Sequence, residues 1–170
     1  MYKVVVLGEG GVGKTTLLEV IRKNVIDLRT VQMTIGVQFH EIEVVYNDEN
    51  FKFQVWDFGG QEQFKKMNVF EKFSQGSDGA LFCFDLSDFE TLLMIPEWFE
   101  LAPYCKNTEV AKILIGTKSD LDEDTDESLI KEYIEKFNFS DYIKTSSYDK
   151  YNIELVFKKM AQFIHQLKDI

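Results

Sequence analysis

The segment Gly8-Glu-Gly-Gly-Val-Gly-Lys-Thr15 matches the phosphate-loop pattern G-x-x-x-x-G-K-[ST] in full. A short β-branched run, Lys3–Leu7, precedes it, and residues 13–23, with leucine and isoleucine at helical spacing, follow it. Glycines in such a turn let backbone N–H groups point toward phosphate oxygens, and the N-terminus of the next helix adds positive potential. A chance glycine-rich turn would leave the flanking strand and helix unexplained. The loop therefore predicts an α/β fold that binds phosphate at the end of its first strand.

Two residues of this loop are expected to carry its chemistry. The Lys14 ammonium would reach the β- and γ-phosphates, and the Thr15 hydroxyl would coordinate Mg²⁺. Gly10 and Gly11 extend the loop, and a side chain at Gly10 would crowd the γ-phosphate. Glu9 is an acid beside a phosphate site, so its side chain is expected to point away to solvent.

The rest of the chain is predicted to alternate between strands and helices. The predicted strands are residues 3–7, 35–45, 50–56, 79–86, 110–116 and 142–145, and the predicted helices are residues 13–23, 90–104, 128–137 and 153–167. A turn cluster, Asn47–Asn50, joins the second and third strands as an antiparallel hairpin, and Pro96 and Pro103 are expected to make a helix irregular. These elements predict one α/β domain over residues 1–170: a six-stranded, mostly parallel sheet with one antiparallel edge strand and helices on both faces.

A second group of expected site residues lies around the hairpin. Asp57 ends a strand, where a carboxylate would serve Mg²⁺ directly or through water. Gly60 could present its N–H to a γ-phosphate, and Gln61 can orient a water molecule for in-line attack. Thr34 could give Mg²⁺ a second hydroxyl ligand when GTP is bound. Alone, Asp57 could instead cap a helix and Thr34 would be unremarkable, but the phosphate loop favours the site.

Residues 117–120, Thr-Lys-Ser-Asp, close another strand and are interpreted as a base-reading segment. Asp120 can accept hydrogen bonds from guanine N1–H and N2–H₂, and adenine has neither donor on that edge. The Lys118 stem can lie along the base plane. Ser146 and Ser147 follow the last strand and could supply backbone N–H groups to guanine O6. The alternative for Asp120 is loop solvation within the acidic run that follows.

Charge and cysteine content limit the partners and the compartment. The net charge of −10 argues against nucleic acid as the main partner and against docking of the folded body on anionic lipid. Cys83 and Cys105 form neither a metal-ligand nor a disulfide pattern, which is compatible with a reducing cytoplasm. No apolar run approaches the ~20 residues that span a bilayer. We expect a cytoplasmic chain, peripheral to membranes only through partners or a tail beyond this sequence.

Taken in order, these motifs resemble those of the Ras superfamily of small GTPases over essentially the whole chain. The residues that carry the resemblance are Gly8–Thr15, Thr34-Ile-Gly-Val-Gln-Phe39, Asp57-Phe-Gly-Gly-Gln-Glu62, Thr117-Lys-Ser-Asp120 and Ser146-Ser147. They correspond to the phosphate loop, the two switches, the N/T-K-x-D motif and the S-A motif of the family. The first switch is close to the Rab branch in particular.

Several positions depart from the family pattern. Residues 56–61 are W-D-F-G-G-Q where Rab proteins have W-D-T-A-G-Q, which is closer to Arf-like proteins and Roco GTPase domains. Ile26 stands where the family has a phenylalanine that packs on the guanine edge. Thr34 comes one residue later than the family spacing, and the stretch 61–79 is about two residues longer than in Rab proteins. The prenylated C-terminal cysteines of the family are absent, so no direct membrane anchor is expected in this chain.

The resemblance implies a G domain that binds GTP or GDP with Mg²⁺ and acts as a two-state switch. The implied nucleotide-binding residues are Gly10, Gly11, Val12, Gly13, Lys14, Thr15, Thr16, Thr117, Lys118, Asp120, Leu121, Ser146 and Ser147. The implied Mg²⁺ ligands are Thr15, Thr34 and Asp57, and the implied catalytic residues are Gln61, Lys14, Thr34 and Gly60. Effectors, exchange factors and GTPase-activating proteins would bind a monomer through the switches, where Phe39, Trp56 and Phe64 form either an exposed apolar patch or core packing.

Hydrolysis by the chain alone is expected to be slow. Neither Arg22 nor Arg29 is obviously placed to stabilise the transferring phosphoryl charge, although Arg29 as a built-in finger stays open. An arginine supplied by a partner would raise the rate by ~10³–10⁵. Two other functions stay open: a GTP-dependent binding module that does not hydrolyse, and a P-loop kinase or ATPase. The second would leave residues 117–120 unexplained.

Overall fold

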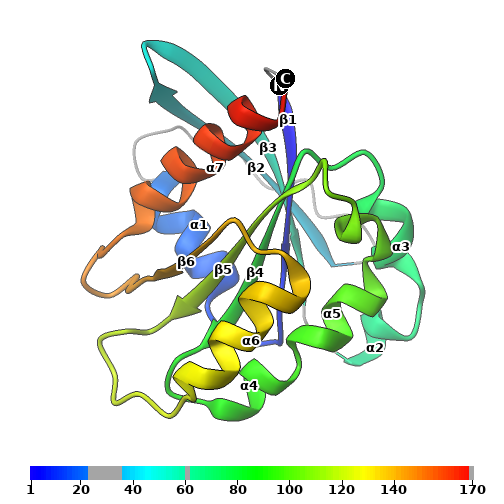
Figure 1. Cartoon of the computed structure of the whole chain (residues 1–170), viewed down its shortest axis with the longest axis vertical. Coiled ribbons are helices and arrows are strands. Elements are labelled where there is room, and N and C mark those ends of the chain that lie inside the picture. Colours follow the sequence, from blue (N-terminus) through cyan, green and yellow to red (C-terminus); the bar gives the residue numbers. More distant parts are fainter. Residues whose placement is uncertain (23–35, 60–61, 169–170) are drawn as a thin grey trace.

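The computed structural model describes residues 1–22, 36–59 and 62–168, whose strands form one six-stranded sheet in the order β2-β3-β1-β4-β5-β6 (Figure 1). The strands are β1 (Tyr2–Leu7), β2 (Val37–Tyr46), β3 (Glu49–Phe58), β4 (Gly79–Asp85), β5 (Ala111–Thr117) and β6 (Asp141–Lys144). β2 pairs antiparallel with β3, and the other neighbouring pairs are parallel. The predicted sheet, mostly parallel with one antiparallel edge strand, is confirmed.

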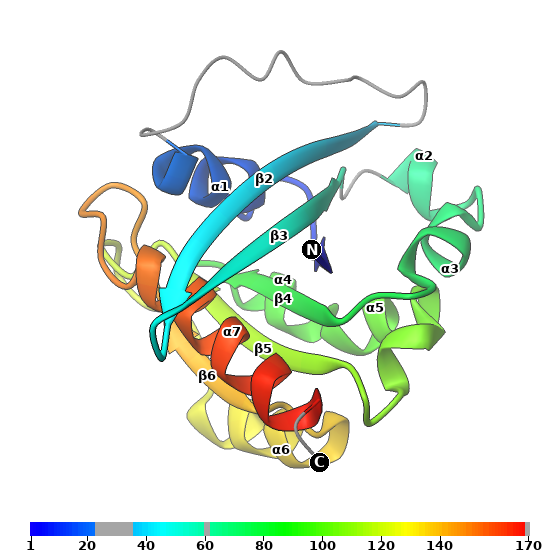
Figure 2. The same ribbon diagram turned by 90° about the horizontal axis from the view of Figure 1, so that it is seen from above.

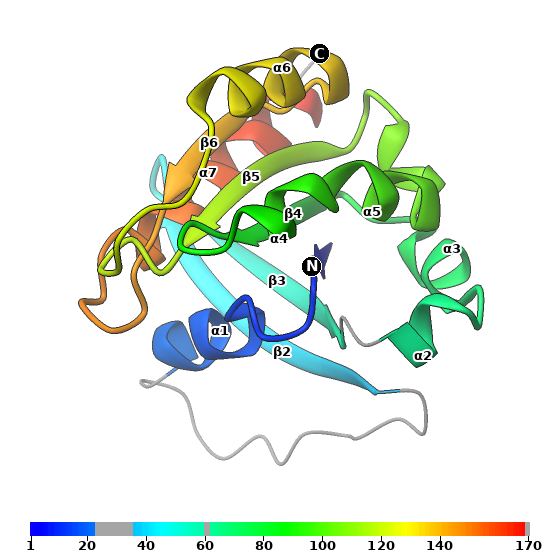
Figure 3. The same cartoon turned by 90° about the horizontal axis from the view of Figure 1, so that it is seen from below.

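Helices cover both faces of the sheet. They are α1 (Lys14–Arg22), α2 (Glu62–Lys65), α3 (Val69–Ser74), α4 (Phe89–Leu93), α5 (Ile95–Leu101), α6 (Glu127–Phe137) and α7 (Ile153–Lys168), with a 3₁₀ helix η1 (Pro103–Lys106). Buried residues of α1 and α7 pack in one cluster, and those of α3, α4, α5 and α6 pack in another. The views in Figures 1, 2 and 3 show α1 and α7 on the opposite side of the sheet from α3 and α5.

The central strands consist mostly of apolar residues because both of their faces are covered. In β1, Val4 and Val6 belong to the cluster with α1 and α7, whereas Val5 and Leu7 belong to the cluster on the other face. Every residue of β4 and β5 is likewise buried. These strands fix the position of the loops that follow their carboxyl ends.

The predicted hairpin between the second and third strands is confirmed. Its two turn residues, Asn47 and Asp48, both have a left-handed backbone, with φ of 51° and 62°. Two consecutive positive φ values define the mirror-image turn that matches the twist of a two-residue hairpin, and Asn and Asp tolerate that conformation best among residues with a side chain.

The single helix predicted for residues 90–104 is wrong. The segment forms α4, α5 and the 3₁₀ helix η1 instead, with breaks at Met94 and Ala102. Pro96 lies in the first turn of α5 and Pro103 begins η1, because proline has no N–H to continue a preceding helix and is tolerated at a helix start. Two short helices, α2 and α3, were not predicted at all.

The parallel register brings the strand ends to one edge of the sheet. β1 aligns with β3 so that Val6 lies beside Asp57, and β4 aligns with β5 so that Asp85 lies beside Thr117. In open α/β sheets the ligand binds outside the carboxyl ends of the strands. The loops that follow these four strands therefore share the edge where the sequence predicted the site.

Candidate nucleotide-binding site

The phosphate loop between β1 and α1 has the tight geometry that its glycines were expected to allow. Gly8 has φ of +147°, and a Cβ placed on it would lie 2.3 Å from the carbonyl oxygen of Cys83, so no side chain fits there. Gly11 has φ of +78°, a conformation that side-chain-bearing residues rarely adopt. The loop thus passes close to β4 and turns directly into α1.

Lys14 lies buried beneath this loop. Only 6% of the residue is exposed, and its Nζ donates to the carbonyl oxygens of Gly8 at 2.8 Å and of Glu9 at 2.7 Å. Burial lowers the pKa of Lys14 from its ordinary value. A buried lysine held at a glycine-rich loop is an arrangement that suits the binding of phosphate oxygens.

Two oxygen donors meet at the start of α1. The Thr15 hydroxyl donates to Asp57 Oδ2 at 2.5 Å, and Asp57 is only 4% exposed at the end of β3. Hydroxyl and carboxylate oxygens are the donors that Mg²⁺ prefers. Among the described residues no group of three or more His, Cys, Asp or Glu side chains gathers as a metal site. A Thr–Asp pair fits Mg²⁺, which proteins commonly bind through few side-chain oxygens together with phosphate and water.

A buried histidine behind Asp57 was missed by the sequence reasoning. His40 of β2 is 1% exposed, its Nδ1 lies 2.8 Å from Arg22 Nη1, and its Nε2 lies 3.8 Å from Asp57 Oδ2. The available signal was its position on β2, because His40 stands where the strand's alternation places an inward-facing apolar residue such as Ile42.

The base-reading segment is tied to the phosphate loop. The Thr117 hydroxyl lies within hydrogen-bond distance of the Val12 carbonyl at 2.5 Å, and Lys118 Nζ donates to the Gly11 carbonyl at 2.8 Å. Lys118 also forms an ion pair with Asp85 at 2.7 Å. Burial alone would raise the pKa of Asp85, but hydrogen bonds from Lys118 and Ser87 leave it lowered.

Asp120 faces a pocket of about 220 Å³ between the two loops. Its Oδ1 accepts a hydrogen bond from the Ser146 hydroxyl at 2.7 Å, which fixes the carboxylate. The pocket is lined by Val12, Gly13, Thr16, Thr117, Lys118, Asp120, Leu121, Ser147 and Tyr148. All of these except Tyr148 were predicted to bind nucleotide, so eight of the thirteen predicted nucleotide-binding residues line one space.

The expectation that Glu9 points to solvent is wrong. Its Oε1 accepts hydrogen bonds from Lys65 Nζ at 2.6 Å and from Trp98 Nε1 at 3.0 Å. The Lys65 side chain is 4% exposed, and both this buried cation and the buried indole N–H require an acceptor. Burial opposes the charge on Lys65, yet Glu9 and Glu97 hold its pKa above the ordinary value.

Some predicted residues lie outside the described part of the chain. They are Thr34, Gly60 and Gln61 of the predicted catalytic and metal sets, together with Ile26 and Arg29. Their roles stay predictions.

The three aromatic residues expected near the switches are neither fully exposed nor fully buried. The rings of Phe39 and Trp56 meet edge to face at 4.6 Å between centroids, and both pack against the core cluster on the α5 side of the sheet. The Phe64 ring lies over Gly36, where a Cβ would come within 2.6 Å of it. The two alternatives, an apolar patch and core packing, thus each describe part of these side chains.

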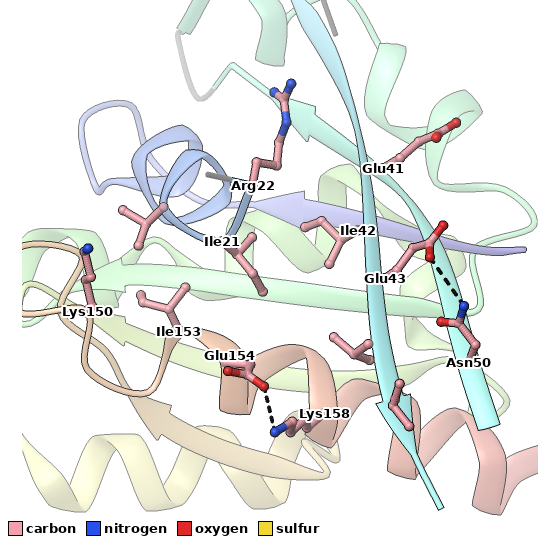
Figure 4. Close-up of a pocket in the computed structure, with 13 residues that line it drawn as sticks. Ile21, Arg22, Glu41, Ile42, Glu43, Asn50, Lys150, Ile153, Glu154 and Lys158 are labelled. Atoms are coloured by element: carbon pink, nitrogen blue, oxygen red, sulfur yellow. Dashed lines mark hydrogen bonds and ion pairs between the residues drawn. The ribbon is translucent and has the colours of Figure 1, made fainter. Parts of the chain in front are cut away.

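A larger hollow of about 840 Å³ lies between α1, β2 and α7, away from the phosphate loop (Figure 4). Its floor includes Ile42 and Ile153, and its rim carries Lys150 and an ion pair between Glu154 and Lys158. None of the predicted nucleotide-binding residues lines it.

No helix within the described residues is long and apolar enough to cross a membrane.

Comparisons with known proteins agree with this geometry. The family model described as "Ras family" matches residues 3–166. The "Ras-related protein Rab-11A" of Dictyostelium discoideum is 32% identical over 98% of this chain and 77% of its own length. The "Ras-related protein Rab-11B" of the same organism is 31% identical over 97% of this chain and 74% of its length. Together with the six-stranded sheet, these matches show that the chain belongs to the Ras family of small GTPases and is Rab-like.

Proposed function

We propose that this chain is a molecular switch that binds GTP or GDP with Mg²⁺ and hydrolyses GTP slowly. The observation that carries the proposal is the meeting of three groups at one edge of the sheet: buried Lys14, the Thr15–Asp57 pair and the pocket in front of Asp120. Each group matches one part of a guanine nucleotide with its cation. Family membership supports the same reading.

The phosphate loop would bind the polyphosphate. Backbone N–H groups of residues 10–15 would donate to phosphate oxygens, and Lys14 Nζ would contact the β- and γ-phosphates while keeping its carbonyl partners. Burial disfavours the charge on Lys14 in the structure as described, and phosphate would offset that cost.

Thr15 and Asp57 would hold Mg²⁺, with Thr34 as the predicted third oxygen ligand. A bound cation would supply positive charge that neutralises the charge developing on the phosphates. The chain's own part is to hold the two oxygens together at the end of β3, where Asp57 is buried and fixed by the Thr15 hydroxyl.

Asp120 would select guanine. Its carboxylate is oriented by Ser146 and lies beside the pocket that Lys118 borders, so it can accept the two N–H groups on the guanine edge. Adenine has neither N–H group on that edge and would leave the Asp120 carboxylate without these two partners, which disfavours adenine.

Gln61 would orient the attacking water, and Gly60 would donate its N–H to the γ-phosphate. Arg22 Nη1 lies 2.8 Å from His40 Nδ1 at the end of α1. We expect hydrolysis by the chain alone to be slow, as the resemblance to small GTPases implies. We propose that effectors, exchange factors and activating proteins bind near the two switches of a monomer, and that the acidic chain takes no nucleic acid partner.

Single-turnover hydrolysis of GTP separates this proposal from a binding module that does not hydrolyse. The native protein, loaded with GTP and Mg²⁺, should release phosphate over minutes to hours. Gln61→Leu should lower that rate by at least about tenfold, since one positioned group supplies on the order of 10²–10⁴-fold, and GTP binding should stay native. Equal rates for both proteins would remove Gln61 from the mechanism, and no phosphate release by the native protein would favour the binding module.

A further inference from the structure

His40 is a buried polar residue beside the carboxylate proposed to serve Mg²⁺. In the antiparallel pairing of β2 with β3, His40 lies opposite Val55 and Gln38 lies opposite Asp57. His40 and Asp57 are therefore diagonal neighbours on one face of the sheet, the face covered by α1. Both residues are almost completely buried, at 1% and 4% exposure.

The contact with Arg22 fixes which nitrogen of the ring carries the proton. Arg22 Nη1 lies 2.8 Å from His40 Nδ1. A guanidinium group only donates hydrogen bonds, so Nδ1 must accept and the proton of the neutral ring must sit on Nε2. His40 thus presents an N–H donor on its other side.

The Nε2–H group of His40 lies on the side of the ring near Asp57. His40 Nε2 has no hydrogen-bond partner among the described residues, and Asp57 Oδ2 lies 3.8 Å from it. A buried donor without a partner is rare in native structures and calls for a physical explanation. Asp57 has acceptor capacity to spare, because a carboxylate accepts about four hydrogen bonds and Thr15 supplies one.

We propose that His40 is a positioning residue for the divalent-cation site, acting on Asp57 through its Nε2–H group. A small movement of the Asp57 carboxylate toward His40 would complete a chain of donors from Arg22 through His40 to Asp57. Groups that hydrogen-bond to metal ligands orient them and commonly change metal affinity by 10–100-fold. The charge of Arg22 would strengthen the Nε2–H donor, because hydrogen bonds in a chain polarise one another. This inference rests on the proposed binding of a nucleotide with Mg²⁺.

Two isosteric substitutions separate the two sides of the ring. The amide nitrogen of glutamine reaches about as far as Nε2, whereas that of asparagine reaches only as far as Nδ1. His40→Gln therefore keeps a donor toward Asp57, and His40→Asn keeps only the contact on the Arg22 side. Both variants place a polar amide in the same buried position, so the free-energy cost of burying the amide is similar in the two.

The test is the rate of release of fluorescent GDP as a function of buffered free Mg²⁺, for the native protein and both variants. We expect the Mg²⁺ concentration that gives half-maximal slowing to rise on the order of tenfold in His40→Asn, and to stay within about threefold of native in His40→Gln. Release in excess EDTA should be the same for all three proteins, because the His40 ring approaches Arg22 and Asp57 within the described part of the chain, and neither is proposed to bind the nucleotide itself.

Equal Mg²⁺ midpoints for His40→Asn and the native protein would overturn the inference, and so would equal shifts in both variants or a faster release in EDTA that accounts for the whole effect. If the native protein retains GDP with no response to Mg²⁺, or binds none, the proposed function fails and the inference fails with it. A normal native response with an unchanged His40→Asn overturns the His40 inference alone.

A second measurement does not depend on any variant folding. The chain has two histidines, so ¹⁵N spectra of the native protein resolve the tautomer of each ring. We expect His40 to carry its proton on Nε2, and the Nε2–H resonance of the GDP-bound protein to shift downfield when Mg²⁺ is added. A proton on Nδ1, or a resonance that Mg²⁺ leaves unchanged, would contradict the role.

Discussion

Tyr148 stands at the mouth of the base pocket with 86% of its surface exposed. Tyr148 is the one aromatic residue among the described residues that line this pocket. An exposed aromatic ring beside a pocket sized for a planar base offers a stacking surface, and stacking of a base on an aromatic side chain contributes about 1–3 kcal/mol. The sequence places Ile26 where the family carries its aromatic contact, and among the described residues Tyr148 offers an aromatic ring at this pocket.

We predict that Tyr148→Ala accelerates GDP release roughly fivefold, which corresponds to about 1 kcal/mol of lost stacking. Tyr148→Phe should release GDP at the native rate, because the ring and not the hydroxyl makes the contact. Tyr151→Ala is the matched control, since Tyr151 is also exposed but does not line the pocket. Stopped-flow fluorescence measures the rate of GDP release from the native protein and the three variants. A native release rate for Tyr148→Ala would exclude stacking of the base on this ring.

Linear motifs could place Lys14, Thr15 and Asp57, because Lys14 and Thr15 follow β1, Asp57 lies next to the last residue of β3, and parallel strands end at one edge. They could not place His40 against Asp57. That contact depends on the register of β2 against β3, which the spacing of residues within either strand does not contain. For the same reason the partner of Glu9 was missed, since Lys65 and Trp98 lie far along the chain.

At the scale of elements, one ion pair links α2 to the phosphate loop. Lys65 is the last residue of α2, Glu9 belongs to the loop, and Trp98 of α5 donates to the same carboxylate oxygen. Glu97 lies 3.4 Å from Lys65 on the outer side. α2 directly follows Gln61, which is predicted to be catalytic, and the link fixes the end of α2 relative to the phosphate loop.

We predict that Glu9→Gln lowers the free energy of unfolding by about 3 kcal/mol, the low end for breaking a buried pair because Glu9 keeps 21% exposure. Lys65→Met should cost a similar amount, and the double variant should cost much less than the sum. Urea unfolding of the native protein, the two single variants and the double variant gives the coupling free energy between Glu9 and Lys65. Additive losses would show that the two side chains do not act on each other.

The pH dependence of this link follows from the raised pKa of Lys65. A lysine with a folded-state pKa above its unfolded value contributes stability that is fully present below the unfolded pKa and is lost as pH rises through the folded one. The difference in the free energy of unfolding between the native protein and Lys65→Met should therefore be constant near neutral pH. It should shrink only above about pH 10.4. A difference that already disappears at pH 8 would contradict the pairing.

Elements were predicted well where apolar residues repeat regularly and poorly where they do not. The buried strands β4 and β5 and the amphipathic helix α7 appear close to their predicted bounds. Residues 90–104 have helical spacing throughout, but Pro96 and Pro103 each removed an N–H and forced a new start. α2 and α3 have four and six residues, too short for a periodic pattern to stand out.

At the scale of the whole molecule, the two cysteines report on the integrity of both core clusters. Cys83 lies in the cluster with α1 and α7, and Cys105 lies in the other. Both are fully buried, and burial raises the pKa of each thiol to about 12. Neither side chain can become a reactive thiolate without opening of the fold.

We predict that thiol reagents label neither cysteine of the native protein at pH 8 within minutes, and both after unfolding. Labelling at low denaturant should slow further when GDP and Mg²⁺ are added, because a ligand that binds only the folded state stabilises it by mass action. Mass spectrometry of the labelled chain counts the modified sites. Rapid labelling of either cysteine in the native state would contradict the packing of its cluster.

The central claim is that this chain binds guanine nucleotide at the edge formed by residues 8–15, Asp57 and Asp120. The most direct test is to incubate the purified protein with equimolar GDP and ADP in Mg²⁺, remove free nucleotide, denature the protein and identify what is released by chromatography. The account predicts GDP at close to one per chain and almost no ADP. Release of ADP in comparable amount, or of neither nucleotide, would contradict it.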